Sequence, residues 1–185
     1  MTSEALVVFV FDALAALEVP FMLTGSLASN FYGVPRATQD ADLVVDYKAL
    51  PVDAFAARVG SHFDVDPQAG FESVTGSLRL VARARASAFD VDLFGLTTDR
   101  HDVARFERRR FVDVLGRTVA VPTVEDAVIN KLRWFALARR RKDFEDARNV
   151  IAVQAASIDW TDLRGWCRDL GLEAELAQAE KSLVG

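Results

Sequence analysis

The segment from residue 21 to residue 46 constrains the fold of this chain more than any other. A short apolar run at 21–24 predicts a buried strand that stops at the Gly25-Ser26 turn. A short helix is expected over 26–32, and a loop then leads into a second strand at 41–46. The order strand, turn, helix, loop, strand indicates a mixed α/β core.

Two carboxylates stand at the start of the second strand. Asp40 and Asp42 are two residues apart, so in a strand they point to one face and lie about 7 Å apart along it. Ala41 and Leu43 point the other way and are apolar, which predicts that the opposite face is buried. Two acids on a half-buried strand repel each other without cations, so the pattern favours a divalent metal site over a solvated edge.

A site for two metal ions needs a third acid. The stretch at 89–94 offers Asp90 and Asp92 on one strand face. Asp92 is framed by Val91 and Leu93, on a strand that is predicted to lie deeper in the sheet. We therefore expect Asp92 to converge on Asp40 and Asp42, with Asp90 as the substitute.

The Gly25-Ser26 turn is a candidate phosphate site. Gly25 has no side chain and permits close approach of a phosphate, and Ser26 lies where the following helix presents unpaired N–H groups. Arg36 and Thr38, between the turn and the acids, are candidates to contact phosphate or to orient the loop. For Arg36 a structural ion pair is an equal alternative.

Composition limits the classes of function. The chain has 185 residues, of which 51% are hydrophobic, enough for one core with a helical appendage. The formal net charge of −5 argues against binding nucleic acid through a broad basic surface. A single cysteine, Cys167, suits a reducing compartment, and Asp12 interrupts the only apolar run near the N-terminus. We therefore expect a cytoplasmic protein with no membrane partner.

Periodicity predicts the remaining elements and the fold class. We expect α+β: a mixed sheet flanked by helices within residues 1–121, and a helical C-terminal subdomain over 122–185, with a cleft between them. The expected helices lie at 3–18, 51–60, 123–138, 143–154, 161–170 and 172–183; the expected strands lie within 71–84, at 88–94, and in a hairpin at 110–115 and 118–121.

Other polar residues carry weaker signals. Arg79, Arg83 and Arg85 alternate with apolar residues, so a strand there would present a basic row on one face. His62 and His101 have no metal-ligand spacing with cysteine or with each other, and we expect both on the surface.

Lys131 occupies an unusual place in the helix expected at 123–138. A helical projection puts it inside the apolar stripe of that helix. Either its long stem carries the ammonium out to water, or the helix faces the cleft and Lys131 meets nucleotide phosphates. Asp143 and Asp146, three residues apart at the start of the next helix, suit a capping role as well as a catalytic one.

These motifs together resemble those of the nucleotidyltransferase superfamily of the DNA polymerase beta type. The similarity covers roughly residues 20 to 150 and is closer to the AbiEii-like branch of bacterial abortive-infection and toxin–antitoxin nucleotidyltransferases. The residues that carry it are Gly25-Ser26, Tyr32 to Leu43, Val91-Asp92-Leu93, Lys131 and Lys142 to Asp146.

The resemblance implies a specific activity. An acceptor hydroxyl would attack the α-phosphate of a nucleoside triphosphate such as ATP, with Mg²⁺ or Mn²⁺ as cofactor and pyrophosphate as product. Asp40, Asp42 and Asp92 would be catalytic residues and metal ligands, and Asp143 would support the site. The nucleotide-binding residues would be Gly25, Ser26, Arg36, Thr38 and Lys131.

The acceptor stays open at this point. It could be an RNA such as tRNA, a protein or a small molecule, and a cognate antitoxin is a possible partner. The alternatives are an aminoglycoside-type nucleotidyltransferase, which needs an acidic acceptor pocket, and a non-catalytic nucleotide-binding module of antitoxin-like or regulatory type.

Overall fold

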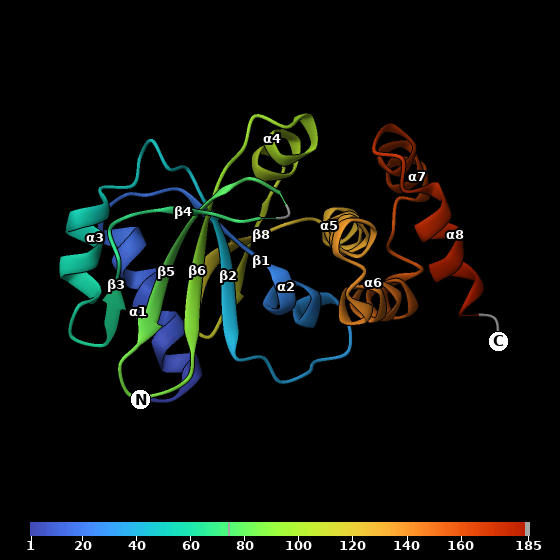
Figure 1. Ribbon diagram of the computed structural model, residues 1–185. Helices are drawn as coiled ribbons and strands as arrows, with labels where there is room; N and C mark the ends of the chain where they lie inside the picture. The colour runs from blue at the N-terminus through green and yellow to red at the C-terminus, as the bar shows by residue number, and fades with distance from the viewer. Residues whose placement is uncertain (74, 184–185) are drawn as a thin grey trace. The chain divides into compact units, whose positions relative to one another are not determined.

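The computed structural model describes residues 1–73 and 75–183, and its contacts divide the chain into two compact units (Figure 1). The first unit comprises Met1–Thr24 and Thr38–Val121, and the second comprises Gly25–Ala37 and Pro122–Gly185. The sequence analysis assigned residues 25–37 to the core. In the structure this segment groups with the C-terminal helices, because the helix it forms packs against two of them.

The first unit is built on a six-stranded mixed sheet (Figure 1). The strand order is β1-β2-β6-β5-β3, with β4 paired to β5. The β2–β6 pair is parallel and the other pairs of this sheet are antiparallel. The strands are β1 (Phe21–Thr24), β2 (Asp40–Val45), β3 (Phe63–Val65), β4 (Gly70–Phe71), β5 (Leu78–Ala84) and β6 (Asp90–Gly95).

One face of this sheet is an apolar core. Ala41, Leu43 and Val45 of β2 are all fully buried, as the alternation in the sequence predicts. Helices α1 (Ser3–Ala16) and α3 (Val52–Val59) pack against each other in the same unit. A separate hairpin, β7 (Arg110–Val114) and β8 (Arg117–Val121), completes the strands.

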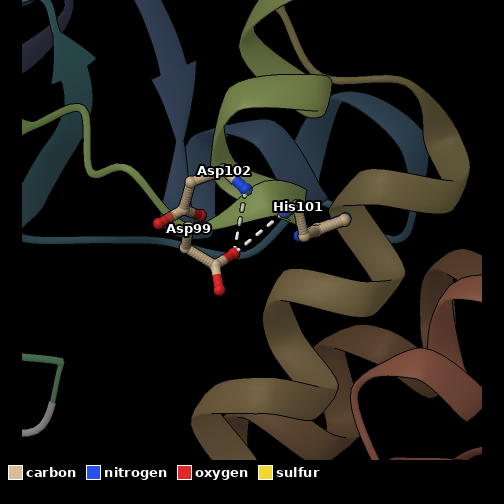
Figure 2. Close-up of side chains that lie close together, drawn as sticks. All are labelled: Asp99, His101 and Asp102. Carbon is tan, nitrogen blue, oxygen red and sulfur yellow. Dashed lines mark hydrogen bonds between the residues drawn. The ribbon is translucent and has the colours of Figure 1, made fainter.

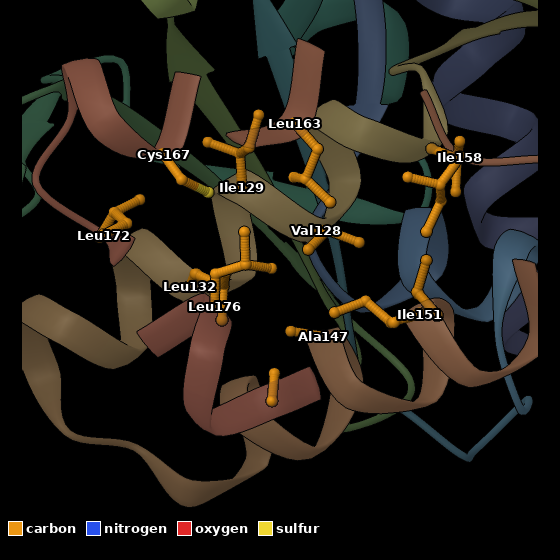
Figure 3. Close-up of a cluster of buried hydrophobic side chains, with 13 residues drawn as sticks. Val128, Ile129, Leu132, Ala147, Ile151, Ile158, Leu163, Cys167, Leu172 and Leu176 are labelled. Carbon is orange, nitrogen blue, oxygen red and sulfur yellow. The ribbon is translucent and has the colours of Figure 1, made fainter. Parts of the chain in front are cut away.

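The regular elements described in the second unit are helices. Its elements are α2 (Gly25–Tyr32), α5 (Val124–Ala138), α6 (Arg141–Gln154), α7 (Trp160–Asp169) and α8 (Glu173–Lys181). Figure 3 shows their shared core, a cluster of buried side chains that includes Leu132, Ile151, Leu163 and the sulfur of Cys167. Burial raises the pKa of the Cys167 thiol to about 12, so this cysteine is an inert packing residue.

The α+β class with a mixed sheet and a helical C-terminal part is confirmed, but two elements were not predicted. The first is β3, a three-residue strand. The second is α4 (Arg100–Glu107). Asp99 precedes this helix and caps it, because its carboxylate accepts from the amides of His101 and Asp102. Within the described residues, no helix is both long and apolar enough to cross a bilayer.

The expectation that His101 lies on the surface is wrong. The side chain is fully buried, because α4 turns residues 101, 105 and 106 to its inner face at helical spacing. His62 is half-buried and packs edge-on against the ring of Phe9.

The helical core supports a matched stability test. Leu132 is fully buried in the cluster of Figure 3, whereas Leu137 of the same helix is 58% exposed. We expect Leu132→Ala to lower the free energy of unfolding by about 2–5 kcal/mol, and Leu137→Ala to change it by less than about 0.5 kcal/mol. Urea titration followed by tryptophan fluorescence measures both, since the three tryptophans lie in this unit. Equal effects of the two substitutions would contradict the assigned packing.

Candidate active site

Four carboxylates lie on one face of the sheet in the first unit. The parallel register of β2 and β6 sets Asp40 opposite Asp90 and Asp42 opposite Asp92. Register partners on neighbouring strands point to the same side, so the acids of both strands share the face opposite the apolar core. The structure thus brings Asp92 beside Asp42, and Asp90 beside Asp40. We call these four side chains the acidic face.

Asp92 is the most buried member of the acidic face, at 6% exposure. Its Oδ2 accepts from Arg79 of β5 at 2.7 Å, while its buried Oδ1 has no hydrogen-bond partner in the part of the chain that the structure describes. Burial raises the pKa of Asp92, the Arg79 guanidinium partly offsets this, and the charges of Asp40 and Asp90 raise the pKa further. Arg79 therefore neutralises the buried carboxylate at Oδ2 alone, and Oδ1 lacks a donor among the described residues.

Thr38 acts on the first acid of the pair. Its hydroxyl donates to Asp40 Oδ1 at 2.5 Å, which orients that carboxylate at the start of β2. On β1, the antiparallel neighbour of β2, Thr24 is the register partner of Asp42. Thr38, which the sequence analysis treated as a possible phosphate contact, is seen in the structure as a support for Asp40.

The acidic face fits a divalent cation. Carboxylate oxygens are the ligands that Mg²⁺ and Mn²⁺ prefer, and Oδ1 of Asp92 is an acceptor that no donor of the described residues uses. The residues that would hold the ion are Asp40, Asp42 and Asp92, with Asp90 adjacent on the same face.

The candidate phosphate turn lies in the second unit. Gly25, the first residue of α2, has a φ of +61°, a left-handed conformation that favours glycine. Ser26 follows, and its Oγ accepts from Arg36 Nη2 at 2.9 Å. Four of the predicted nucleotide-binding residues, Gly25, Ser26, Arg36 and Lys131, therefore lie in one unit, and Thr38 lies in the other.

The same unit contains a buried group of charges on α5 and α6. Lys131 Nζ forms ion pairs with Asp143 at 3.1 Å and with Asp146 at 2.8 Å, and its side chain is only 5% exposed. Asp146 also receives two hydrogen bonds from Arg36, each 2.8 Å long. The ammonium does not snorkel to water; it lies between two carboxylates.

A second group with metal-ligand chemistry is Asp99, His101 and Asp102, shown in Figure 2. Its ligand atoms lie within 4.8 Å of one another, but both of its acids already accept hydrogen bonds from residues in or next to α4. Asp99 caps α4, while Asp102 accepts from Thr97 and Arg105. These contacts explain the group structurally, so the acidic face is the stronger metal candidate.

The sequence analysis did not identify the contacts that two residues, Arg79 and Asp146, make with the candidate site residues. Arg79 was placed in a basic row with Arg83 and Arg85, and the register shows that Arg79 and Arg83 share the acidic face: Arg83 is opposite Asp90, and Val81, which lies between the two arginines, is opposite Asp92. Asp146 was named beside Asp143, which was preferred, yet Asp146 is the carboxylate that contacts both Arg36 and Lys131. The alternation of Arg79 with apolar residues was the sequence signal that it shares a strand face with the acids. The helical spacing of Asp143 and Asp146 gave no signal that Asp146 contacts Arg36.

Comparison with known proteins establishes the fold. No protein-family model matches the chain, and no curated protein matches it. The solution structure of the antibiotic-resistance factor ANT(2'')-Ia is similar over 96% of this chain and 97% of that one, with 14% identity and a TM-score of 0.62.

Two further solved structures agree. An antigenic nucleotidyltransferase-like protein from Paracoccidioides brasiliensis is similar over 97% of this chain and 93% of its own, with 18% identity and a TM-score of 0.54. The lincosamide antibiotic adenylyltransferase LnuA matches 80% of this chain and 96% of its own, with 10% identity and a TM-score of 0.52. The chain therefore has a nucleotidyltransferase fold, and at these identities the likeness defines the fold alone.

Metal binding to the acidic face is directly testable. We expect Mg²⁺ or Mn²⁺ to raise the melting temperature of the wild type, because an ion that binds only the folded state stabilises it. Asp92→Asn should abolish this rise, whereas Asp53→Asn, an exposed acid on α3, should keep it. Thermal unfolding with and without each ion measures the effect. A rise that persists in Asp92→Asn would place the ion elsewhere.

Proposed function

We propose that this protein is a metal-dependent nucleotidyltransferase that moves a nucleoside monophosphate from a nucleoside triphosphate to a hydroxyl acceptor and releases pyrophosphate. The observation that carries the proposal is the in-register pair Asp42 and Asp92, in which one buried oxygen of Asp92 has no hydrogen-bond partner within residues 1–73 and 75–183. The nucleotidyltransferase fold supports the same reading.

The acids have distinct proposed roles. Asp40, Asp42 and Asp92 would hold Mg²⁺ or Mn²⁺, which when bound neutralises developing phosphate charge. Asp92 would also orient the acceptor hydroxyl and accept its proton. Its position opposite Asp42 on the same face of the sheet supports that role. Thr38 would keep Asp40 in its ligand orientation.

The triphosphate is assigned to the turn of the second unit. The Gly25 backbone would let phosphate oxygens approach closely, and the first amides of α2 would donate to them. Ser26 Oγ accepts from Arg36, so its own O–H is left as a donor for a phosphate oxygen. The half-exposed Arg36 would add positive charge beside it.

The charges of the acidic face bear on the acceptor. If three acids hold metal, the charged side chains left on this face of β5 and β6 are Asp90, Arg79 and Arg83, which together carry one net positive charge. A polycationic aminoglycoside needs surplus acids, so we propose an RNA, a protein or an uncharged or anionic small molecule as acceptor. The motif resemblance favours a toxin–antitoxin or abortive-infection setting, with a cognate antitoxin as partner and Asp143 as a supporting acid.

Transfer by the proposed acids has a direct assay. Purified protein incubated with each α-labelled nucleoside triphosphate, Mg²⁺ or Mn²⁺ and cell extract should label an acceptor. We expect Asp42→Asn to lower transfer by at least about 100-fold. Removing a group that only supports a metal ligand lowers metal affinity or activity by roughly 10- to 100-fold, and removing a direct ligand should cost at least as much. Asp53→Asn is the control. Nucleotide binding by the wild type without any transfer would favour the non-catalytic regulatory module instead.

The drug-modifying alternative is separately testable. ANT(2'')-Ia and LnuA are named for antibiotics, so an antibiotic acceptor is the natural competitor. Because Arg79 and Arg83 share the acidic face, we expect expression of the wild type to leave aminoglycoside susceptibility unchanged. Minimum inhibitory concentrations measure this, with Asp42→Asn as the inactive control. Resistance that depends on Asp42 would overturn the proposed acceptor class, whereas growth arrest that depends on Asp42 would support a toxin.

A further inference from the structure

We infer that Asp146 is a positioning residue for the triphosphate turn, acting on Ser26 through Arg36, and that Lys131 is its buried counter-ion and not a phosphate ligand. The inference rests on the proposed function and concerns residues of the second unit only.

Asp146 holds Arg36 by a two-point contact. Oδ1 accepts from Nε and Oδ2 from Nη2, both at 2.8 Å, which is the fork geometry that fixes the plane of a guanidinium. The same Nη2 donates to Ser26 Oγ at 2.9 Å. An unbroken chain of hydrogen bonds therefore runs from Asp146 through Arg36 to the hydroxyl of the turn.

The backbone of Arg36 is held as well. Asn30 of α2 donates from Nδ2 to the Arg36 carbonyl at 2.7 Å and accepts from the Arg36 amide at 3.1 Å. With its main chain tied to α2 at both groups, Arg36 can lose its orientation only through its side chain. Asp146 is the carboxylate that holds that side chain in place.

Arg36 and Lys131 together keep Asp146 ionised. Burial alone raises the pKa of Asp146, but the hydrogen bond from Arg36 and the charge of Lys131 outweigh it, and the pKa lies below its usual value. Asp146 is thus ionised at neutral pH. A buried carboxylate in this state needs compensating cations, and Lys131 at 2.8 Å is one of them.

Exposure separates the two cations. The Lys131 side chain is 5% exposed and lies between Asp143 and Asp146, whereas the Arg36 side chain is 35% exposed. Arg140 forms a further ion pair with Asp143 at 2.8 Å. A phosphate would have to displace two buried ion pairs to reach Lys131, while Arg36 reaches solvent with its contacts to Asp146 intact.

The test is a double-mutant cycle on binding of inorganic triphosphate to the full chain, measured by calorimetry. Asp146→Asn and Arg36→Lys should each weaken affinity by about tenfold or more, as expected for loss of a charge-assisted hydrogen bond. The double variant should bind no more weakly than Arg36→Lys alone, because Asp146 acts through Arg36. Lys131→Met should change affinity much less than Arg36→Lys.

Glu145→Gln is the matched control, since it breaks an exposed ion pair with Arg141 one residue away from Asp146 on the same helix. Its affinity should equal that of the wild type. Circular dichroism and melting temperature verify folding of each variant. Should Asp146→Asn or Lys131→Met not fold, Arg36→Lys and Ser26→Ala form a second cycle, which must also be non-additive.

The outcomes separate the inference from the proposed function. Additive losses, wild-type affinity in folded Asp146→Asn, or an equal loss in folded Lys131→Met would overturn the positioning role alone. A wild type that binds neither inorganic triphosphate nor any nucleoside triphosphate would overturn the proposed function itself. A wild type that binds triphosphate with non-additive losses but transfers nothing would leave the positioning role intact.

Discussion

The parallel, in-register pairing of β2 with β6 is the constraint on which the candidate site depends. It sets Asp42 beside Asp92 and Asp40 beside Asp90, while Leu43 and Leu93 meet on the opposite face in the core. Because side chains alternate along a strand, a slip by one residue would turn the carboxylates of one strand into the core and its leucine out of it. The apolar core therefore enforces the geometry of the acids, and fold stability and site geometry depend on the same register.

A second theme is the pairing of buried carboxylates with cations. In the first unit Arg79 contacts one oxygen of Asp92, and the other oxygen has no donor in the part of the chain that the structure describes. In the second unit Asp146 has cations on both oxygens, Arg36 and Lys131. The contrast has a chemical meaning: a carboxylate with a spare buried oxygen is suited to bind an ion, whereas a fully paired one is suited to hold a neighbouring group in place.

Local signals accounted for most of the fold. Proline, glycine and capping positions, together with apolar alternation, predicted α1, β1, α2, β2, α5 and the hairpin to within a few residues. They missed β3, which is too short to show a period. They also missed α4, because its sequence is too polar to show an apolar stripe after the capping residue Asp99. His101 was misplaced for the same reason, since its burial depends on a helix that had not been recognised. Lone signals of this kind fail where tertiary contacts decide the conformation.

The sequence by itself determined which residues are candidates for the site: the spacing of Asp40 and Asp42 puts them on one strand face, and Gly25 provides the turn at the start of α2. Only the tertiary structure decided their partners. The β2–β6 register, the contact of Arg79 with Asp92 and the position of Asp146 between Arg36 and Lys131 all join residues far apart in the chain. Periodicity reports which way a side chain points within its own element, but the neighbour that it meets is set by packing between elements, which no local pattern encodes.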